Sequence, residues 1–235
     1  MEQMAGADWG AFASTANGAF LLAFPSLFSI INPIGGAFIF YGVTKDFASA
    51  DRVKTAAQVG LYALLIMFGA LWAGAGVLNF FGVSIEALRL AGGTVVALSG
   101  WQLLMSGGYH PDQTGHEKHL GAGAGLDPAQ VAFFPLTLPF TTGPGTIAVA
   151  ITISAERPSS GVGVIAFFVG ASVAAAANAA IVWIAYRFAD RLTNFIGPTA
   201  RQVIVRLTAF LLVCIGAQIL VTAVGELIAQ WRVVT

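Results

Sequence analysis

The sequence predicts an all-α integral membrane protein with six transmembrane helices, arranged as two inverted three-helix repeats. Three observations predict this class: an apolar composition, six long runs without charge, and proline motifs at matching places in the two halves. Of the 235 residues, 57% are hydrophobic and 9% are charged, and the mean hydropathy is +0.81. Ordinary soluble domains carry about 25% charged residues, so the lipid bilayer is the first partner that we expect.

Six segments contain no Asp, Glu, Lys or Arg, and each is 19 to 36 residues long. A helix needs roughly 17–25 mainly apolar residues to cross a hydrocarbon core of about 30 Å. Each segment therefore predicts one transmembrane helix in a single membrane domain that fills residues 1–235. In chain order, the segments are 9–44, 55–85, 90–111, 128–155, 158–186 and 207–225.

Charge, cysteine and histidine usage exclude several function classes. Eleven basic and eleven acidic residues cancel, so no basic face is expected for nucleic acid. The single cysteine, Cys214, excludes an internal disulfide and a CxxC site. An enzyme is not expected, because a nucleophile needs a paired base, and all three histidines fall in one glycine-rich connection at 108–127. There His116 and His119 with Glu117 lack a fourth ligand at fixed spacing, so neither a metal nor a cofactor is predicted.

The distribution of Lys and Arg predicts the orientation. Loops on the cytoplasmic side of bacterial membrane proteins are enriched in these residues. The first, third and fifth loops hold eight of them, and the other loops and tails hold three, so both termini should lie on the periplasmic side. The eight are Lys45, Arg52, Lys54, Lys118, Arg187, Arg191, Arg201 and Arg206, and the three are Arg89, Arg157 and Arg232.

Matching motifs in the two halves indicate an internal repeat. Phe24-Pro25 followed by Asn32-Pro33 resembles Phe134-Pro135 followed by Gly143-Pro144, and a Gly-x-Gln pattern ends at Gln102 and at Gln218. We expect a first repeat at 13–107 and a second at 128–230. Because each repeat has three helices, the halves must lie in opposite orientation in the bilayer, as in many secondary transporters.

The proline motifs predict breaks in the first and fourth transmembrane helices, at Asn32-Pro33 and at Gly143-Pro144-Gly145. Asn is a preferred N-cap and Pro a preferred first helical residue, so each motif begins a new half-helix near the bilayer midplane. A helix N-terminus offers free N–H groups and partial positive charge to an anion, while the carbonyls that end the preceding half-helix suit a cation. A zwitterion meets both demands.

The predicted substrate site gathers around these breaks. Backbone N–H groups of Ile34, Gly35, Gly145 and Thr146 would donate to a carboxylate, while Asn32, Thr141 and Thr142 would position the breaks or bind an ammonium group. The small flanking residues leave room only for a small ligand. With Gly143, Asn178 and the helix-breaking Pro33 and Pro144, these residues complete the predicted site. For Asn178, Gln102 and Gln218, a place on the cavity and an interhelical hydrogen bond stay equally open.

The charged residues nearest the predicted helices are expected at the membrane surface and not in a binding site. Glu86 and Glu226 lie at helix ends, where solvated caps are expected, and Arg89 and Arg206 are expected to extend to the interface rather than into a cavity. No Asp or Glu lies within the six charge-free segments. The sequence therefore disfavours antiport of drug cations, which needs a buried carboxylate.

Four ordered motifs resemble the MarC family of bacterial inner-membrane proteins. Residues 28–35 (FSIINPIG) and 135–145 (PLTLPFTTGPG) are similar to its two hallmark segments, and 88–93 (LRLAGG) and Arg206-Leu207 followed by Gln218 resemble its third and sixth helices. The resemblance covers about residues 20–228. It implies a six-helix inner-membrane protein, related to transporters of small neutral amino acids such as glycine and alanine, and it does not imply drug efflux.

One residue departs from the family pattern: Phe38 stands where NPxGxxP has its second proline, which places a bulky ring near the predicted cavity. The sequence as a whole favours a secondary transporter that carries a small neutral amino acid. A channel for a small neutral solute or ion, and a non-transporting membrane scaffold, are the alternatives. The coupling ion (H⁺, Na⁺ or none), the direction of transport and oligomerisation are left open.

Overall fold

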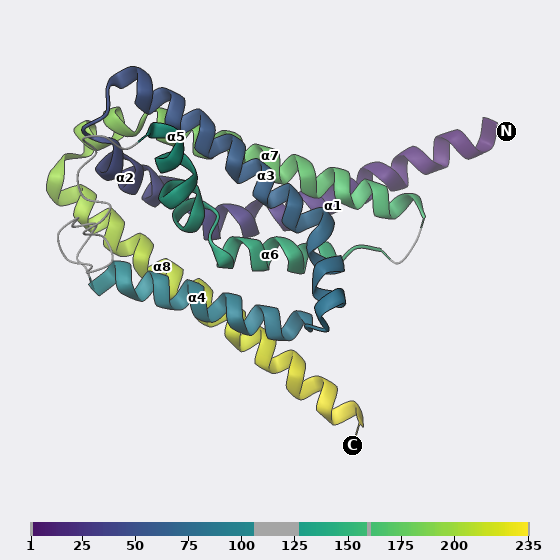
Figure 1. The fold of residues 1–235 in the computed structure, drawn as a ribbon. Coiled ribbons are helices and arrows are strands. Elements are labelled where there is room, and N and C mark those ends of the chain that lie inside the picture. Colours follow the sequence, from purple (N-terminus) through teal and green to yellow (C-terminus); the bar gives the residue numbers. More distant parts are fainter. Residues whose placement is uncertain (1, 106–126, 159–160, 235) are drawn as a thin grey trace.

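The computed structural model describes residues 2–105, 127–158 and 161–234, and in these ranges the chain is helical without a β-strand (Figure 1). Most helices are long and apolar, and a short helix and a π-helical segment precede α6. In chain order the elements are α1 (Glu2–Ile31), α2 (Pro33–Thr44), α3 (Ser49–Phe81), α4 (Ile85–Met105), α5 (Pro128–Val131), η2 (Ala132–Thr141), α6 (Pro144–Ala155), α7 (Val162–Arg187) and α8 (Ala189–Val234).

Four segments of the described chain are long and apolar enough to cross a membrane, and the bent pair of α5–η2 with α6 makes a fifth, with an angle of 63°. The fold is therefore that of a helical membrane protein. Helix α4, where the third of six spans is predicted, is not among them because Glu86, Arg89 and Gln102 lower its apolarity. The four candidates other than the bent pair are Trp9–Thr44, which joins α1 and α2, Ser49–Phe81, Val162–Arg187 and Gln202–Ala229.

The core forms where α1 and α3 pack on α7, and small residues permit this packing. Helix α7 carries Gly170, Ala171, Ala174 and Ala175, all buried. A Cβ atom on Gly170 would collide with the carbonyl oxygen of Ala16 in α1, so only glycine allows this close approach. The core of the membrane domain thus depends on backbones that nearly touch, as is typical of helix pairs in lipid.

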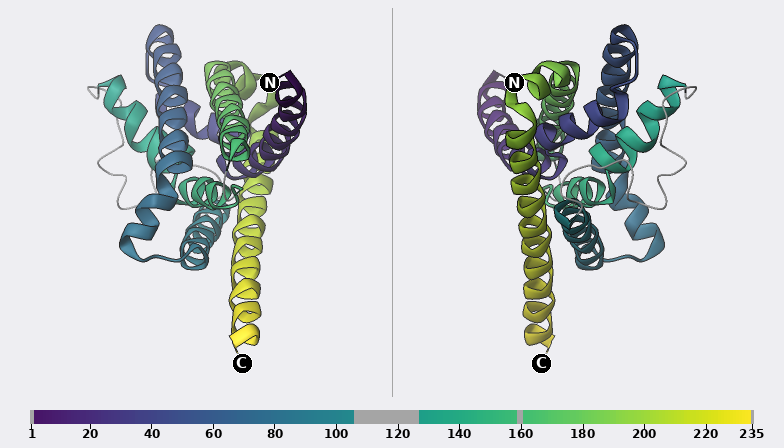
Figure 2. Two further views of the ribbon diagram at one scale, coloured as in Figure 1. Left: turned by 90° about the vertical axis from the view of Figure 1, so that its right-hand side faces the viewer. Right: turned by 90° about the vertical axis from the view of Figure 1, so that its left-hand side faces the viewer.

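Helices α4 and α8 form a second close pair, and they lie alongside each other in both views of Figure 2. A Cβ on Gly93 would lie 3.1 Å from the carbonyl oxygen of Gly216, and a Cβ on Gly100 would lie 2.7 Å from the amide nitrogen of Val213. Because Gly93 and Gly100 lack side chains, α4 can pack closely against α8 at both positions. Glycine 197, with φ of 73°, interrupts α8 before its apolar part begins.

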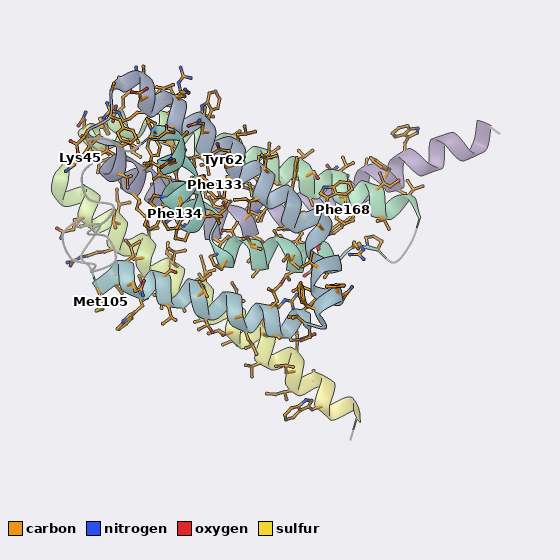
Figure 3. The ribbon with its side chains drawn as sticks, viewed as in Figure 1. Lys45, Tyr62, Met105, Phe133, Phe134 and Phe168 are labelled. Carbon is orange, nitrogen blue, oxygen red and sulfur yellow. The ribbon has the colours of Figure 1, made fainter. Side chains whose placement is uncertain are left out.

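Large apolar side chains face outward. Phe80 is 83% exposed and Phe195 is 91% exposed, and Trp72 and Trp101 are also exposed. A soluble monomer rarely presents so much apolar surface, whereas lipid covers it in a membrane. Figure 3 shows side chains of this kind along the outside of the helices, and it places Lys45, which follows the last residue of α2, and Met105, which ends α4, at the same end of the molecule.

Candidate functional site

The first break is a single residue. Helix α1 ends at Ile31, Asn32 adopts the left-handed conformation (φ 50°, ψ 66°), and α2 begins at Pro33. Asparagine tolerates this conformation better than most residues. Its side chain is the N-cap, since Oδ1 accepts a hydrogen bond from the N–H of Gly35 at 3.1 Å. Asn32 therefore positions the break, which is one of the two roles predicted for it.

This cap leaves little of the first break free for a ligand. The N–H of Gly35, expected to be free, is already used by Asn32, and the N–H of Gly36 donates to the carbonyl oxygen of Asn32 at 2.9 Å. Only the N–H of Ile34 makes no hydrogen bond within the described residues. The prediction that Gly35 donates to a carboxylate is wrong, because the Asn32 side chain reaches that donor first.

The second break is longer and has no side-chain cap. Segment η2 ends at Thr141, Gly143 is extended (φ −72°, ψ −179°), and α6 begins at Pro144. The N–H groups of Gly145 and Thr146 make no hydrogen bond within the described residues. A helix N-terminus with unused donors is a place where negative charge is stabilised. The second break therefore has a free N–H group two residues after its proline, where the side chain of Asn32 occupies the N–H group in the first break.

Segment η2 is less regular than the sequence predicts. Phe134 and Leu138 have non-helical backbone angles, and each precedes a proline. A proline disfavours the helical conformation of the residue before it, which explains both departures. The hydroxyl groups of Thr137 and Thr141 donate to carbonyl oxygens five residues earlier, at 2.7 and 2.6 Å. The π-helical turns thus use threonine hydroxyls to satisfy buried carbonyls next to the break.

Tyr186 in α7 joins the two breaks, a role that the sequence analysis missed. Its hydroxyl forms a 2.8 Å hydrogen bond with Thr141 Oγ1 at the end of η2. Its ring stacks on Phe40 of α2 at a centroid distance of 4.8 Å, and a Cβ on Gly36 would collide with its hydroxyl. The lone signal in the sequence was a tyrosine at the end of an apolar run, which is common at membrane interfaces.

Asn178 takes the second of its two predicted roles. It is fully buried in α7, and its amide Nδ2 donates to the carbonyl oxygen of Phe24 in α1 at 3.2 Å and to that of Ala174 at 2.9 Å. Its Oδ1 is buried and has no partner within the described residues. Asn178 is therefore an interhelical link next to Pro25 rather than a wall of the cavity described next.

A cavity of about 200 Å³, here called the α6 cavity, lies between α1, α4, α6 and α8. Of the predicted site residues, it contains only Gly145. Gly145 also packs directly against the buried Val96 of α4, with which a Cβ on Gly145 would collide. The α6 cavity is lined by Leu22, Ser26, Arg89, Gly92, Gly93, Gly145, Ala148, Val149, Thr152, Ile153, Glu156, Gln218, Ile219 and Thr222.

The remaining predicted residues lie outside this lining. Thr141, Thr142 and Thr146 are buried, and Thr142 Oγ1 donates to the carbonyl oxygen of Thr137 at 3.3 Å. Ile34 is half exposed. Phe38, the departure from the family pattern, is buried and does not line the α6 cavity. The two breaks are therefore linked through Tyr186, and one of them, the second, opens on the cavity.

Arg89 contradicts the interface interpretation. Its side chain is 16% exposed and lines the α6 cavity, where Nη1 pairs with Glu226 of α8 and Nη2 lies 3.5 Å from Glu156 Oε1. Arg206, its counterpart in the second half, is exposed. Gln218 also lines the α6 cavity, and Gln102 is exposed. The sequence could not distinguish these pairs because both members occupy equivalent positions in their helices.

Within 2–105, 127–158 and 161–234, no three His, Cys, Asp or Glu side chains are placed to hold an ion. His110, His116 and His119 with Glu117, in the predicted connection 108–127, lie outside the described residues.

Comparison with known proteins places the chain in a family. Residues 18–228 match the model for MarC family integral membrane proteins. The chain belongs to this family. It is 34% identical to the UPF0056 inner membrane protein MarC of Salmonella paratyphi A over 212 residues, which cover 88% of this chain and 94% of the relative. The MarC proteins of Citrobacter koseri and Escherichia coli O1:K1 are 34% and 32% identical over the same shares. No solved structure matches.

Proposed function

We propose that this MarC family protein is a secondary transporter of small neutral amino acids in the bacterial inner membrane. The observation that carries the proposal is the α6 cavity, a half-open cavity whose lining includes Gly145 at an uncapped helix N-terminus. The free amide of Gly145, which lines the cavity, favours a carboxylate, and the free amide of the neighbouring Thr146 adds to the positive potential of the same helix N-terminus. A volume of about 200 Å³ is below the ~300–1,000 Å³ of pockets for drug-sized ligands, which favours a glycine- or alanine-like substrate over a drug.

The packing supports two inverted repeats of three spans. The first span of the first half, α1, packs on the second span of the other half, α7, and the corresponding spans of the reverse pair, η2–α6 and α3, also pack on each other. The two second spans, α3 and α7, pack together, as do the two third spans, α4 and α8. A twofold relation between the halves would produce this pattern, in which each helix of one half packs on the corresponding partner in the other half. Helix α4, the third span in chain order, would then complete the six. Its 21 residues extend about 31 Å at 1.5 Å per residue, which is the thickness of a hydrocarbon core.

The loops support an orientation with periplasmic termini. In Figure 1, the ends of α2, α4 and α7 lie at one end of the molecule, while both termini and the turn between α3 and α4 lie toward the other. The first end carries most Lys and Arg residues, including Lys45, Arg52, Arg187 and Arg191. By the positive-inside rule this end is cytoplasmic. The α6 cavity then opens toward the periplasmic half.

Uptake by purified protein in liposomes tests the proposal. Labelled glycine, alanine, serine, leucine and glutamate are supplied with a proton gradient, a sodium gradient or neither. We expect saturable uptake of glycine and alanine, and accelerated exchange when unlabelled substrate is present inside. Flux that is linear in concentration and lacks counterflow would make the protein a channel. No flux of any amino acid, with insertion verified by protease protection, would contradict transport and leave the scaffold alternative.

A further inference from the structure

The α6 cavity is elongated, and a small amino acid cannot touch both its ends at once. Its α6 wall consists of residues three and four apart, from Gly145 through Thr152 to Glu156, which form one face of the helix. Eleven residues at 1.5 Å each separate the two ends by about 16 Å. The carboxylate and ammonium of an α-amino acid are joined through a single carbon. The cavity therefore has two distinct positions, one at Gly145 and one at Arg89.

The Arg89 end is built from charges on three helices. Arg89 of α4 pairs with Glu226 of α8 and lies 3.5 Å from Glu156 at the end of α6. Arg89 is mostly buried, whereas the two glutamates are 40% and 46% exposed. The guanidinium thus pairs with both carboxylates: Glu156 lines the cavity together with Arg89, and Glu226 lies beside the lining, paired with Arg89. These are the two charge types that an amino acid zwitterion presents.

Uncharged polar groups line the cavity between its ends. Thr152 Oγ1 is buried and has no hydrogen-bond partner within the described residues. Gln218 Nε2 lies 3.5 Å from Thr222 Oγ1, a long contact. The wall between the two ends is otherwise mostly apolar, so these few polar residues are the places where a polar ligand could bind on its way from Arg89 toward Gly145.

We propose that Arg89, Glu156 and Glu226 form an outer binding site that selects amino acid zwitterions before they reach Gly145. The substrate carboxylate binds the guanidinium of Arg89, and the substrate ammonium binds the carboxylates of Glu156 and Glu226. Arginine suits this role because its planar donors match a carboxylate. The inference rests on the proposed transport of amino acids and adds to it the residues that recognise the two charges.

The selectivity follows from charge balance. When a zwitterion enters, the existing ion pairs are replaced by arginine with carboxylate and glutamate with ammonium, so every charge keeps an opposite partner. An anion alone would displace the glutamates and leave them without a partner, and a cation alone would do the same to Arg89. A partly buried charge without a partner is costly. The outer site therefore rejects ions that carry a single charge.

Glycine transport and competition in proteoliposomes test the outer site. We compare the native chain with Arg89→Gln, with the double variant Glu156→Gln/Glu226→Gln, and with Arg191→Gln, an exposed arginine at the opposite end that serves as the control. Glycinamide, which lacks the carboxylate, and N-acetylglycine, which lacks the ammonium, are the competitors. For the native chain we expect both to compete at least tenfold more weakly than glycine. We expect at least a tenfold higher KM for Arg89→Gln and for the double variant, and no change for Arg191→Gln.

A purely structural ion pair is distinguished by the triple variant Arg89→Gln/Glu156→Gln/Glu226→Gln, which removes all three charges together. If the charges only hold α4, α6 and α8 in place, removing all of them should restore much of the native KM, whereas a substrate site predicts no rescue. Native transport with unchanged KM in Arg89→Gln would overturn the outer site and leave the proposed function standing. If the native chain neither transports nor binds labelled glycine in detergent, both proposals fail.

Discussion

In both breaks a proline begins the new half-helix, but the two breaks differ in which backbone N–H groups remain free. At Asn32 the side chain caps the new helix, and the N–H groups of Gly35 and Gly36 are already used. At Gly143 there is no side chain to cap, and the N–H groups of Gly145 and Thr146 make no hydrogen bond within the described residues. Only the second break opens on the α6 cavity.

The difference shows how one residue changes what a helix break can do. An Asn in the cap position satisfies the donors locally, so the break becomes a fixed bend that Tyr186 holds from α7. A Gly in the same position leaves those donors available for a ligand. Interrupted helices are therefore not equivalent as binding sites, even where a repeat relates them, and the capping residue decides which one accepts an anion.

The largest expected effect comes from closing the second break. In Gly145→Val, the new side chain collides with Val96 of α4, which packs directly against Gly145 at the wall of the α6 cavity. We expect glycine transport to fall about 100-fold, since displacement of a binding group by 1 Å can cost this much. Gly69→Val is the matched control because a Cβ at Gly69 meets nothing within 4 Å. Equal transport rates of the two variants in proteoliposomes would argue that the second break is not the substrate site.

The first break should respond in stability rather than in substrate affinity. Asn32→Ala loses the cap and places alanine in the left-handed conformation, and we expect it to lower the free energy of unfolding by about 2 kcal/mol. Asn32→Gly keeps the backbone conformation accessible, so about 0.5 kcal/mol is expected. Unfolding in mixed detergent micelles measures both. A native KM for glycine should persist in Asn32→Gly, and a tenfold rise would indicate that the first break binds substrate after all.

The link between the breaks should contribute least. Tyr186→Phe removes the hydrogen bond to Thr141, but Thr141 Oγ1 keeps its bond to the carbonyl oxygen of Leu136. We expect a loss of about 1 kcal/mol, typical of one hydrogen bond. Tyr41→Phe is the control because Tyr41 makes no hydrogen bond within the described part of the chain. A loss of 3 kcal/mol or more from Tyr186→Phe would make Tyr186 a central support of both breaks.

The membrane class and the position of the breaks were accessible from the sequence, because both depend on local properties. Long runs without charge predict apolar helices, and Asn-Pro and Gly-Pro predict helix starts wherever they occur. The proposed inverted arrangement of 13–107 and 128–230 stays a prediction, as do the sixth span in α4 and the periplasmic termini.

The residues that face the cavity could not be predicted in this way. Arg89 and Arg206 occupy matching places in the sequence, yet among the described residues only Arg89 meets carboxylates, and these come from residues 67 and 137 positions away. The Asn32 side chain accepts the N–H of Gly35 because Asn32 adopts the left-handed conformation. The general preference for Asn at helix N-caps does not predict that conformation. The partner of Tyr186 depends likewise on a tertiary contact with η2.

Protection of engineered cysteines by substrate tests the difference between the breaks most directly. In a Cys214→Ser background, Thr222→Cys places a thiol on the α6 cavity, and Thr208→Cys places one beside Gly35 at the first break. Both positions lie on α8, so the two thiols are compared on the same helix. We predict that glycine slows the reaction of a methanethiosulfonate reagent with the thiol at 222 and leaves the reaction at 208 unchanged. Equal protection at both positions, or protection at 208 alone, would contradict the account.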